Sequence, residues 1–387
     1  MLINGLVFWL SLEVLGMAFF ALTSGRLRPA YSFLPQQSGY LQEGTDCFWG
    51  STVFLHPYIE NNYQPRDHCD RKGRNSYGFV GQEMPEVYDP NYYTLMFVGA
   101  SVAEQIANFK IDYQKAAPYI EQFLNSHWVS PSGKPFKVLN SAIGGTAMPA
   151  EFFSLSLFLS RVDHVVSIDG FNEHWRVDRF QSLEEPNGIF RQLAFANSHP
   201  FTFAFLRFRS RLIAKITAGP LKYSYAAALF FEAVDRIPLQ YRKDIDQIRY
   251  FTPYPPTGGR ERINKEIVRT FLRYLNYAKE LCEFEGKKFN NFLQPSLFYA
   301  KTPIGIEVDI LQKNAAVNDG LFKKWVALIE SENNPIIDSM VRLYEKSDQL
   351  IYDADVVHPN NYGTKIMVEH VATRLGEMNR WRRISEN

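Results

Sequence analysis

A strand–helix–strand–helix–strand pattern between residues 92 and 173 constrains the fold of this chain more than any other feature. Compact apolar runs at 92–101, 136–145 and 164–173 have the composition of buried strands. The stretches at 102–126 and 149–162 between them are typical of helices. Strands separated by helices pair in parallel through crossover connections. The pattern therefore predicts an α/β fold, a three-layer α/β/α sandwich with a mostly parallel sheet.

The remaining segments fit around this core. Later core elements are predicted as a helix at 261–286, a strand at 287–299, helices at 321–331 and 336–347, and a loop then a helix at 352–375. Residues 26–90 are predicted to form an irregular lead-in that packs on the core, because Pro, Gly, Asn and Asp interrupt every periodic run. The main domain is predicted over 91–380, with an insertion at about 176–260.

The N-terminal run from Leu2 to Leu22 is long enough to cross a bilayer, which needs about 20 apolar residues. It lacks a basic leading region and a clean cleavage site, so residues 1–25 are predicted to be an uncleaved membrane anchor. The alternative is an amphipathic or buried helix. Glu13 would cost about 2–3 kcal/mol in lipid unless it faces a partner or is protonated.

Composition excludes several classes of function. Basic residues number 42 and acidic residues 41, which argues against a nucleic-acid binder with a general basic field. The chain contains no GxGxxG, P-loop, HExxH or CxxC motif, so no cofactor and no metal are expected. The 31 Phe and 21 Tyr suit either an aromatic core or a surface for sugars, acyl chains or membranes.

Three cysteines and one basic segment leave alternatives open. Cys47 and Cys69 lie in the same loop-rich stretch and either pair outside the cytoplasm or stay as thiols. Cys282 falls in a predicted helix and is expected to be a buried free thiol. The basic amphipathic stretch 203–216 fits a membrane surface or a helix that faces the core.

Small and polar residues end each of the first three predicted strands. These groups are 99–101, 144–146 and 170–173, and a fourth polar group at 355–359 precedes the last helix. Ligands of doubly wound α/β sheets bind at the carboxyl ends of the strands. We therefore expect the functional residues to gather at this edge.

These four groups resemble, in order, the four blocks of the SGNH (GDSL-like) hydrolase superfamily. The sequence Gly-Ala-Ser ending at Ser101 corresponds to the nucleophile block, and Asn-Ser-Ala-Ile-Gly-Gly ending at Gly145 to the second. Gly-Phe-Asn-Glu, with Asn172, corresponds to the GxND block, and Asp355 to His358 to the DxxH block. The resemblance implies a flavodoxin-like sandwich and a membrane-anchored enzyme of bacterial type that modifies cell-surface polysaccharide.

The resemblance implies a catalytic triad of Ser101, His358 and Asp355. Serine needs a base to take its proton, and an acid holds the imidazole in the required tautomer. An oxyanion hole would comprise the N–H groups of Ser101 and Gly145 and the side-chain amide of Asn172, each donor contributing about 3–4 kcal/mol. Gly144 competes with Gly145 for the second place.

Two departures and two rival residues qualify these assignments. Ala100 stands where the family has aspartate, which removes a supporting hydrogen bond, and Glu173 replaces the aspartate of GxND. Asp353 is an alternative to Asp355 as the acid of the triad. The two aspartates also fit a metal-binding acidic pair. His174 is either a substrate contact or a structural histidine.

The functional expectation is a serine esterase or O-acyl (acetyl) transferase that acts on an ester-bearing small molecule or polysaccharide. The alternatives are an inactive scaffold that binds glycan or a membrane acyltransferase partner, and a lipid-acting esterase at the membrane surface. The family resemblance and the cysteine pair favour an extracytoplasmic, periplasmic catalytic domain. Arg26 and Arg28, directly after the apolar run, favour a cytoplasmic one by the positive-inside rule.

Overall fold

A computed structural model provides the structure of the chain. It divides the chain into two compact units, one comprising residues 1–54, 67–71 and 186–251 and the other the remainder. The residues that the structure describes are 2–33, 53–56, 60–63, 73–111, 117–175, 212, 216, 219–236, 259–299, 302–314 and 320–384.

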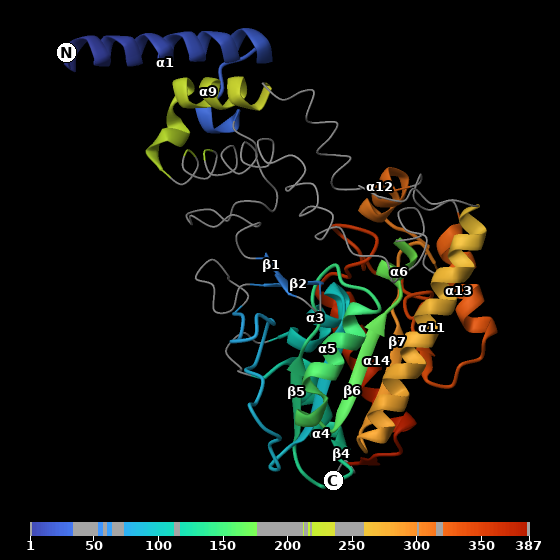
Figure 1. The fold of residues 1–387 in the computed structure, drawn as a ribbon. Coiled ribbons are helices and arrows are strands. Elements are labelled where there is room, and N and C mark those ends of the chain that lie inside the picture. Colours follow the sequence, from blue (N-terminus) through green and yellow to red (C-terminus); the bar gives the residue numbers. More distant parts are fainter. Residues whose placement is uncertain are drawn as a thin grey trace. The chain divides into compact units, whose positions relative to one another are not determined.

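The larger unit is built on a five-stranded sheet in the order β5-β3-β6-β7-β8, in which every neighbouring pair is parallel (Figure 1). In chain order this is the flavodoxin-like arrangement 2-1-3-4-5. The strands are β5 (Phe136–Asn140), β3 (Tyr93–Gly99), β6 (His164–Asp169), β7 (Lys288–Leu293) and β8 (Ile337–Ser339). The predicted fold class is confirmed.

Helices cover both faces of this sheet, as its uniformly buried central strands require. Every residue of β3 and β6 is buried, which is typical of parallel strands between two helical layers. One layer contains α3 (Ser101–Asn108), α4 (Tyr119–His127) and α14 (Asn361–Met378). The other contains α5 (Ala150–Phe158), α11 (Arg260–Phe284) and α13 (Leu321–Ser331).

Shorter elements complete the described part of the larger unit. They are the 3-10 turn η2 (Leu159–Arg161), α6 (Phe171–Trp175), α12 (Ile306–Lys313) and a small antiparallel pair of β4 (Trp128–Val129) with β9 (Arg382–Arg383). The strands β1 (Val53–His56) and β2 (Glu60–Tyr63) form a separate two-stranded sheet. Cys282 on α11 is a buried free thiol, as predicted, and burial raises its pKa to about 12.

Two predicted helices are wrong. The single helix expected at 102–126 is two helices, because Phe109 is already extended and Pro118 caps the start of α4. The helix expected at 336–347 is instead the edge strand β8 followed by turns, in which Ile337 pairs with Asn291 of β7. Buried residues at 336, 340, 341 and 344 imitate a helical period, but they line an edge strand and the turns after it.

The smaller unit pairs the N-terminal helix α1 (Leu2–Ser24) with α9 (Tyr225–Arg236). Two 3-10 turns, η1 (Ala30–Ser32) and η4 (Pro220–Tyr223), pack beside them. Phe20 of α1 and Phe231 of α9 are buried in one apolar cluster with Ile216. The predicted insertion thus contains a helix that packs on α1.

The carboxylate of Glu13, in the middle of the apolar helix α1, is hydrogen-bonded to the start of α9. Its carboxylate accepts the backbone N–H of Tyr225 at 2.7 Å and of Ala226 at 3.3 Å, and it also accepts the hydroxyl of Ser224. These donors belong to the first turn of α9, whose backbone N–H groups lack partners within the helix. The carboxylate therefore caps α9, and this lowers the cost of a charge within α1.

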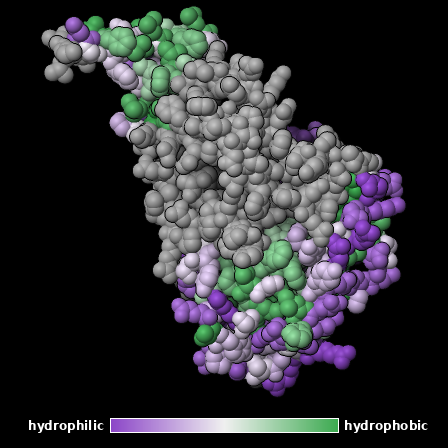
Figure 2. Space-filling view, viewed as in Figure 1, coloured by the Kyte–Doolittle hydropathy of each residue, from purple (hydrophilic) through white to green (hydrophobic). Residues whose placement is uncertain are grey.

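Most of the described α1 surface visible in Figure 2 is apolar and coloured green. Over Val7–Ser24 its mean hydropathy is 1.7, and only 11% of that window is buried. The helix is therefore long and apolar enough to cross a membrane, although an N-terminal signal sequence meets the same criterion. Cys47, Cys69 and most of the basic stretch 203–216 lie outside the described residues.

Candidate active site

Ser101 is the first residue of α3, and only Ala100 separates it from the end of β3. Gly99 ends the strand with φ of +131°, a conformation that essentially only glycine adopts without strain. The turn places Ser101 at the carboxyl edge of β3, beside β6. In the 2-1-3-4-5 order these two strands flank the point at which the chain reverses its direction across the sheet, the usual ligand site of such folds.

Replacing Gly99 with alanine should lower the free energy of unfolding by about 2–4 kcal/mol, because positive φ is strained for alanine and the new methyl group is crowded. A Cβ at this position would lie 2.4 Å from the carbonyl oxygen of Ile168. Gly133 is the matched control, since its φ is +74° but its Cβ would meet nothing within 4 Å, so its change to alanine should cost about 1 kcal/mol. Urea unfolding measures both, and equal losses would contradict the crowding argument.

His358 joins Ser101 to Asp355 through two short hydrogen bonds. Its Nε2 lies 2.7 Å from Ser101 Oγ, and its Nδ1 lies 2.7 Å from Asp355 Oδ2. His358 and Asp355 lie in the loop before α14, while Ser101 comes from α3, 257 residues before His358 in the chain. The three side chains that the sequence predicted as a triad are thus connected in the required order.

Asp355 is also fixed by the backbone of its own loop. Its Oδ1 accepts the N–H of Val357 at 2.8 Å and of His358 at 2.7 Å. Burial acts to raise the pKa of Asp355, but the hydrogen bonds from the His358 ring and from these two N–H groups outweigh it and lower the pKa below its usual value. The carboxylate is therefore ionised at neutral pH. Asp353, its rival, is exposed, and it is Asp355 that contacts the imidazole.

Two residues that the sequence reasoning missed hold this loop in place. Gln105, one turn after Ser101 on α3, donates from Nε2 to the carbonyl of Pro359 at 2.9 Å and to Thr364 Oγ1 at 2.7 Å. The buried Glu307 accepts the N–H groups of Ile351 and Tyr352 through Oε1 at 2.9 and 3.0 Å. Their partners are distant in sequence, so no local pattern could have identified them.

The second block lies against the nucleophile turn. The carbonyl of Gly99 accepts the N–H of Ile143 and the hydroxyl of Thr146, each at 3.1 Å. Between them Gly145 is exposed in a turn with φ of +84°, which explains why glycine occupies this position. Gly145, which the sequence favoured over Gly144, therefore lies in a turn that is hydrogen-bonded to Gly99, two residues before Ser101.

Asn172, in the short helix α6 after β6, contacts the same turn. Its amide donates from Nδ2 to the carbonyl of Thr146 at 2.7 Å. A side-chain amide has two N–H groups, so one remains for a second acceptor. His174 of the same helix is buried, with its ring centroid 5.1 Å from that of Phe322 and 6.4 Å from that of Trp325. These contacts indicate a structural histidine.

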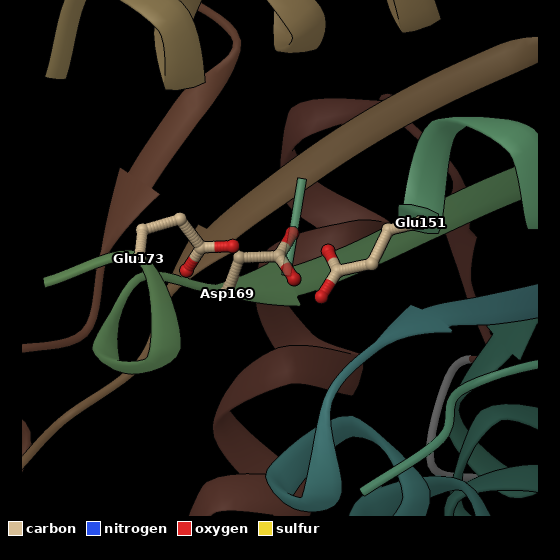
Figure 3. A group of neighbouring side chains, drawn as sticks. All are labelled: Glu151, Asp169 and Glu173. Atoms are coloured by element: carbon tan, nitrogen blue, oxygen red, sulfur yellow. The ribbon is translucent and has the colours of Figure 1, made fainter. Parts of the chain in front are cut away.

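Three buried carboxyl groups come together at α6, and although the sequence singled out Glu173, it did not identify this cluster. Glu151, Asp169 and Glu173 each offer an oxygen within 4.8 Å of the others, with Asp169 in the middle (Figure 3). Burial raises the pKa of Asp169. Burial disfavours the ionised form of a carboxyl group, and neighbouring carboxylates disfavour it further.

The donors around the cluster argue against a cation site. Glu173 accepts two backbone N–H groups, and Asp169 Oδ2 accepts the Ser167 hydroxyl and the Asn291 amide, the latter at 3.2 Å. Oxygens engaged by N–H and O–H donors are poor additional ligands for a cation. The sequence also suggested Asp353 and Asp355 as a metal-binding acidic pair. In the structure Asp355 is bonded to His358 instead, and Asp353 is exposed.

No protein-family model matches this chain, and no curated protein sequence matches it. Among solved structures, an acetyl xylan esterase is similar over 73% of this chain and 99% of its own, with a TM-score of 0.35 and 12% identity. An acetylxylan esterase from Geobacillus stearothermophilus is similar over 78% of this chain and 100% of its own, with a TM-score of 0.37 and 11% identity. The chemistry of this chain rests on its own residues.

Proposed function

We propose that this chain is a serine esterase or O-acyltransferase of the SGNH type, which forms an acyl-enzyme on Ser101. The observation that carries the proposal is the chain of two 2.7 Å contacts from Ser101 Oγ through the His358 ring to Asp355. Serine attacks a carbonyl only when a base within hydrogen-bond distance takes its proton. His358 occupies that place, and an ionised Asp355 stabilises the imidazolium that forms.

The reaction proceeds in two steps. Ser101 Oγ attacks the ester carbonyl while its proton passes to His358 Nε2, and the tetrahedral oxyanion forms beside the N–H of Ser101 at the start of α3. The Gly145 N–H and the free N–H of the Asn172 amide complete the oxyanion hole. His358 then gives its proton to the leaving alcohol. In the second step, water or an acceptor hydroxyl attacks the acyl-enzyme, with His358 again as the base.

The proposed substrate is a short acyl ester, such as an acetyl group on a carbohydrate or cell-surface polysaccharide, as the family resemblance implies. Helix α1 would hold the enzyme at a membrane, with the catalytic unit outside the cytoplasm. Transfer to a sugar hydroxyl differs from hydrolysis only in the acceptor, so the same triad serves both reactions. A membrane acyltransferase that supplies the acyl group is the corresponding partner.

A series of p-nitrophenyl esters from acetate to palmitate tests this function. We expect measurable hydrolysis that declines with increasing acyl length and is unaffected by lipid vesicles. A preference for long chains that vesicles stimulate would instead favour the lipid-acting esterase. Absence of hydrolysis together with absence of labelling by a fluorophosphonate would favour the inactive scaffold. Labelling without hydrolysis would point to a transferase that lacks its acceptor.

A further inference from the structure

Glu173, next to Asn172 in α6, bridges two backbone segments that are distant in sequence. Its Oε1 accepts the N–H of Met148 at 2.9 Å, and its Oε2 accepts the N–H of Gly170 at 3.0 Å. The side chain is almost fully buried, with a relative exposure of 1%. A buried carboxylate that accepts backbone N–H groups through both oxygens makes strong, directional contacts, so it fixes the distance between the two segments.

The two bridged segments carry the two proposed oxyanion donors that lie outside the nucleophile block. Met148 follows the turn that contains Gly145, and Gly170 directly precedes the helix that contains Asn172. A second cross-link between the same segments is the hydrogen bond from the Asn172 amide to the Thr146 carbonyl, at 2.7 Å. Glu173 therefore sets where both donors stand relative to each other.

The neighbouring acids allow Glu173 to act as an anion. Three carboxyl groups this close cannot all be ionised in a buried site, because like charges repel strongly there. Burial raises the pKa of Asp169, which favours its neutral form, and Figure 3 shows that Asp169 and Glu151 lie to one side of Glu173. Both contacts of Glu173 need it as an acceptor, since the backbone N–H groups of Met148 and Gly170 can only donate.

We propose that Glu173 is a positioning residue for the oxyanion hole: as an anion, it joins the Gly145 turn to the Asn172 helix. This inference rests on the proposed function of Ser101, Gly145 and Asn172. It assigns a role to the residue at which the chain departs from the GxND pattern. The longer side chain of glutamate reaches across to Met148 as well as back to Gly170.

The Glu173→Gln variant tests this role. Its amide N–H group would face one of the two backbone N–H donors, so one bridge is replaced by a repulsive contact. We expect kcat for p-nitrophenyl acetate to fall about 10- to 100-fold with KM changed less than about 3-fold, since displacement of oxyanion donors affects the transition state more than substrate binding. The Glu151→Gln variant leaves both bridging hydrogen bonds in place, because Met148 and Gly170 donate to Glu173, so kcat should stay within about 3-fold.

A matched control and a double-mutant cycle separate positioning from a general structural effect. Glu121 accepts the Val138 N–H at 2.8 Å and the Gln82 amide at 2.9 Å, on a helix away from the triad, so Glu121→Gln should leave kcat unchanged. Once Asn172 is alanine, the Glu173→Gln change should cost less than about 5-fold in kcat, because the donor that it positions is already lost. Equal costs in both backgrounds would overturn the proposal.

Hydrogen exchange provides a readout that does not depend on catalysis. In Glu173→Gln, the amides of Met148 and Gly170 should exchange faster than in the wild type, whereas those of β3 should not change. If wild-type protein hydrolyses no ester but exchange changes in this way, the proposed function fails and the bridge remains. Unchanged exchange overturns the bridge itself. If Glu173→Gln does not fold, Glu173→Asp replaces it, and its shorter side chain should release Met148 alone.

Discussion

The Ser101→Ala variant is expected to lose kcat/KM for p-nitrophenyl acetate by about 10⁴-fold or more, because the acyl-enzyme can no longer form. The 2.7 Å contact with His358 Nε2 identifies this hydroxyl as the one from which a base removes the proton. Alanine is well tolerated in a helix, so the melting temperature should change by only a few degrees. Ester hydrolysis and thermal unfolding of the purified protein measure the two quantities.

Ser156 provides the matched control for this loss. It is an exposed serine on α5, whose hydroxyl donates to the carbonyl of Phe152 at 2.8 Å. The Ser156→Ala change should therefore leave kcat/KM within about 2-fold. Retention of more than a tenth of the wild-type activity in Ser101→Ala would exclude an acyl-enzyme on this residue.

The Asp355→Asn variant should lower kcat by about 10³- to 10⁴-fold with a much smaller change in KM. Asparagine fits the loop but can present a donor to His358 Nδ1, so the imidazole takes the tautomer that cannot accept the serine proton. Asp353→Asn is the matched control, because Asp353 is exposed two residues away and should matter less than about 2-fold. Equal losses in the two variants would contradict the assignment of the acid.

The lowered pKa of Asp355 also predicts that acid reduces the stability of the folded state. Because the folded state lowers this pKa, the ionised carboxylate stabilises the fold above the usual carboxyl pKa of about 4. That stability is lost as the pH falls through the lower, folded value. The difference in unfolding free energy between the wild type and Asp355→Asn should therefore shrink below about pH 4. Urea unfolding of both proteins at several pH values measures this difference.

The sequence was sufficient for four strands of the sheet, but not for elements whose pattern is ambiguous. The runs that became β3, β5, β6 and β7 are apolar, short and separated by clear helices, so local composition determines them. The three-residue strand β8 is too short for a pattern of its own, and only its pairing with β7 defines it. The break at Phe109 interrupts a run whose composition remains helical, and Pro118 begins the next helix.

The site shows the same division between local pattern and distant partners. Ser101, Asp355 and His358 lie at strand or loop ends that the sequence pattern identifies. In the structure they are connected by hydrogen bonds. The residues that hold them do not stand out, because Gln105 meets its partners more than 250 residues away. Glu151, likewise, becomes significant only when folding brings it beside Asp169. Glu13 is intermediate, since its cost in lipid implied either a partner or protonation, but the sequence alone did not identify α9.

Fluorophosphonate labelling, with the modified residue located by peptide mass spectrometry, tests the central claim most directly. The reagent modifies only a serine that a neighbouring base activates and whose oxyanion is stabilised. We predict one adduct, on Ser101, that is lost in Ser101→Ala and formed much more slowly in Asp355→Asn. An unlabelled wild-type protein, or an adduct on another serine, would contradict the assignment of Ser101 as an activated nucleophile.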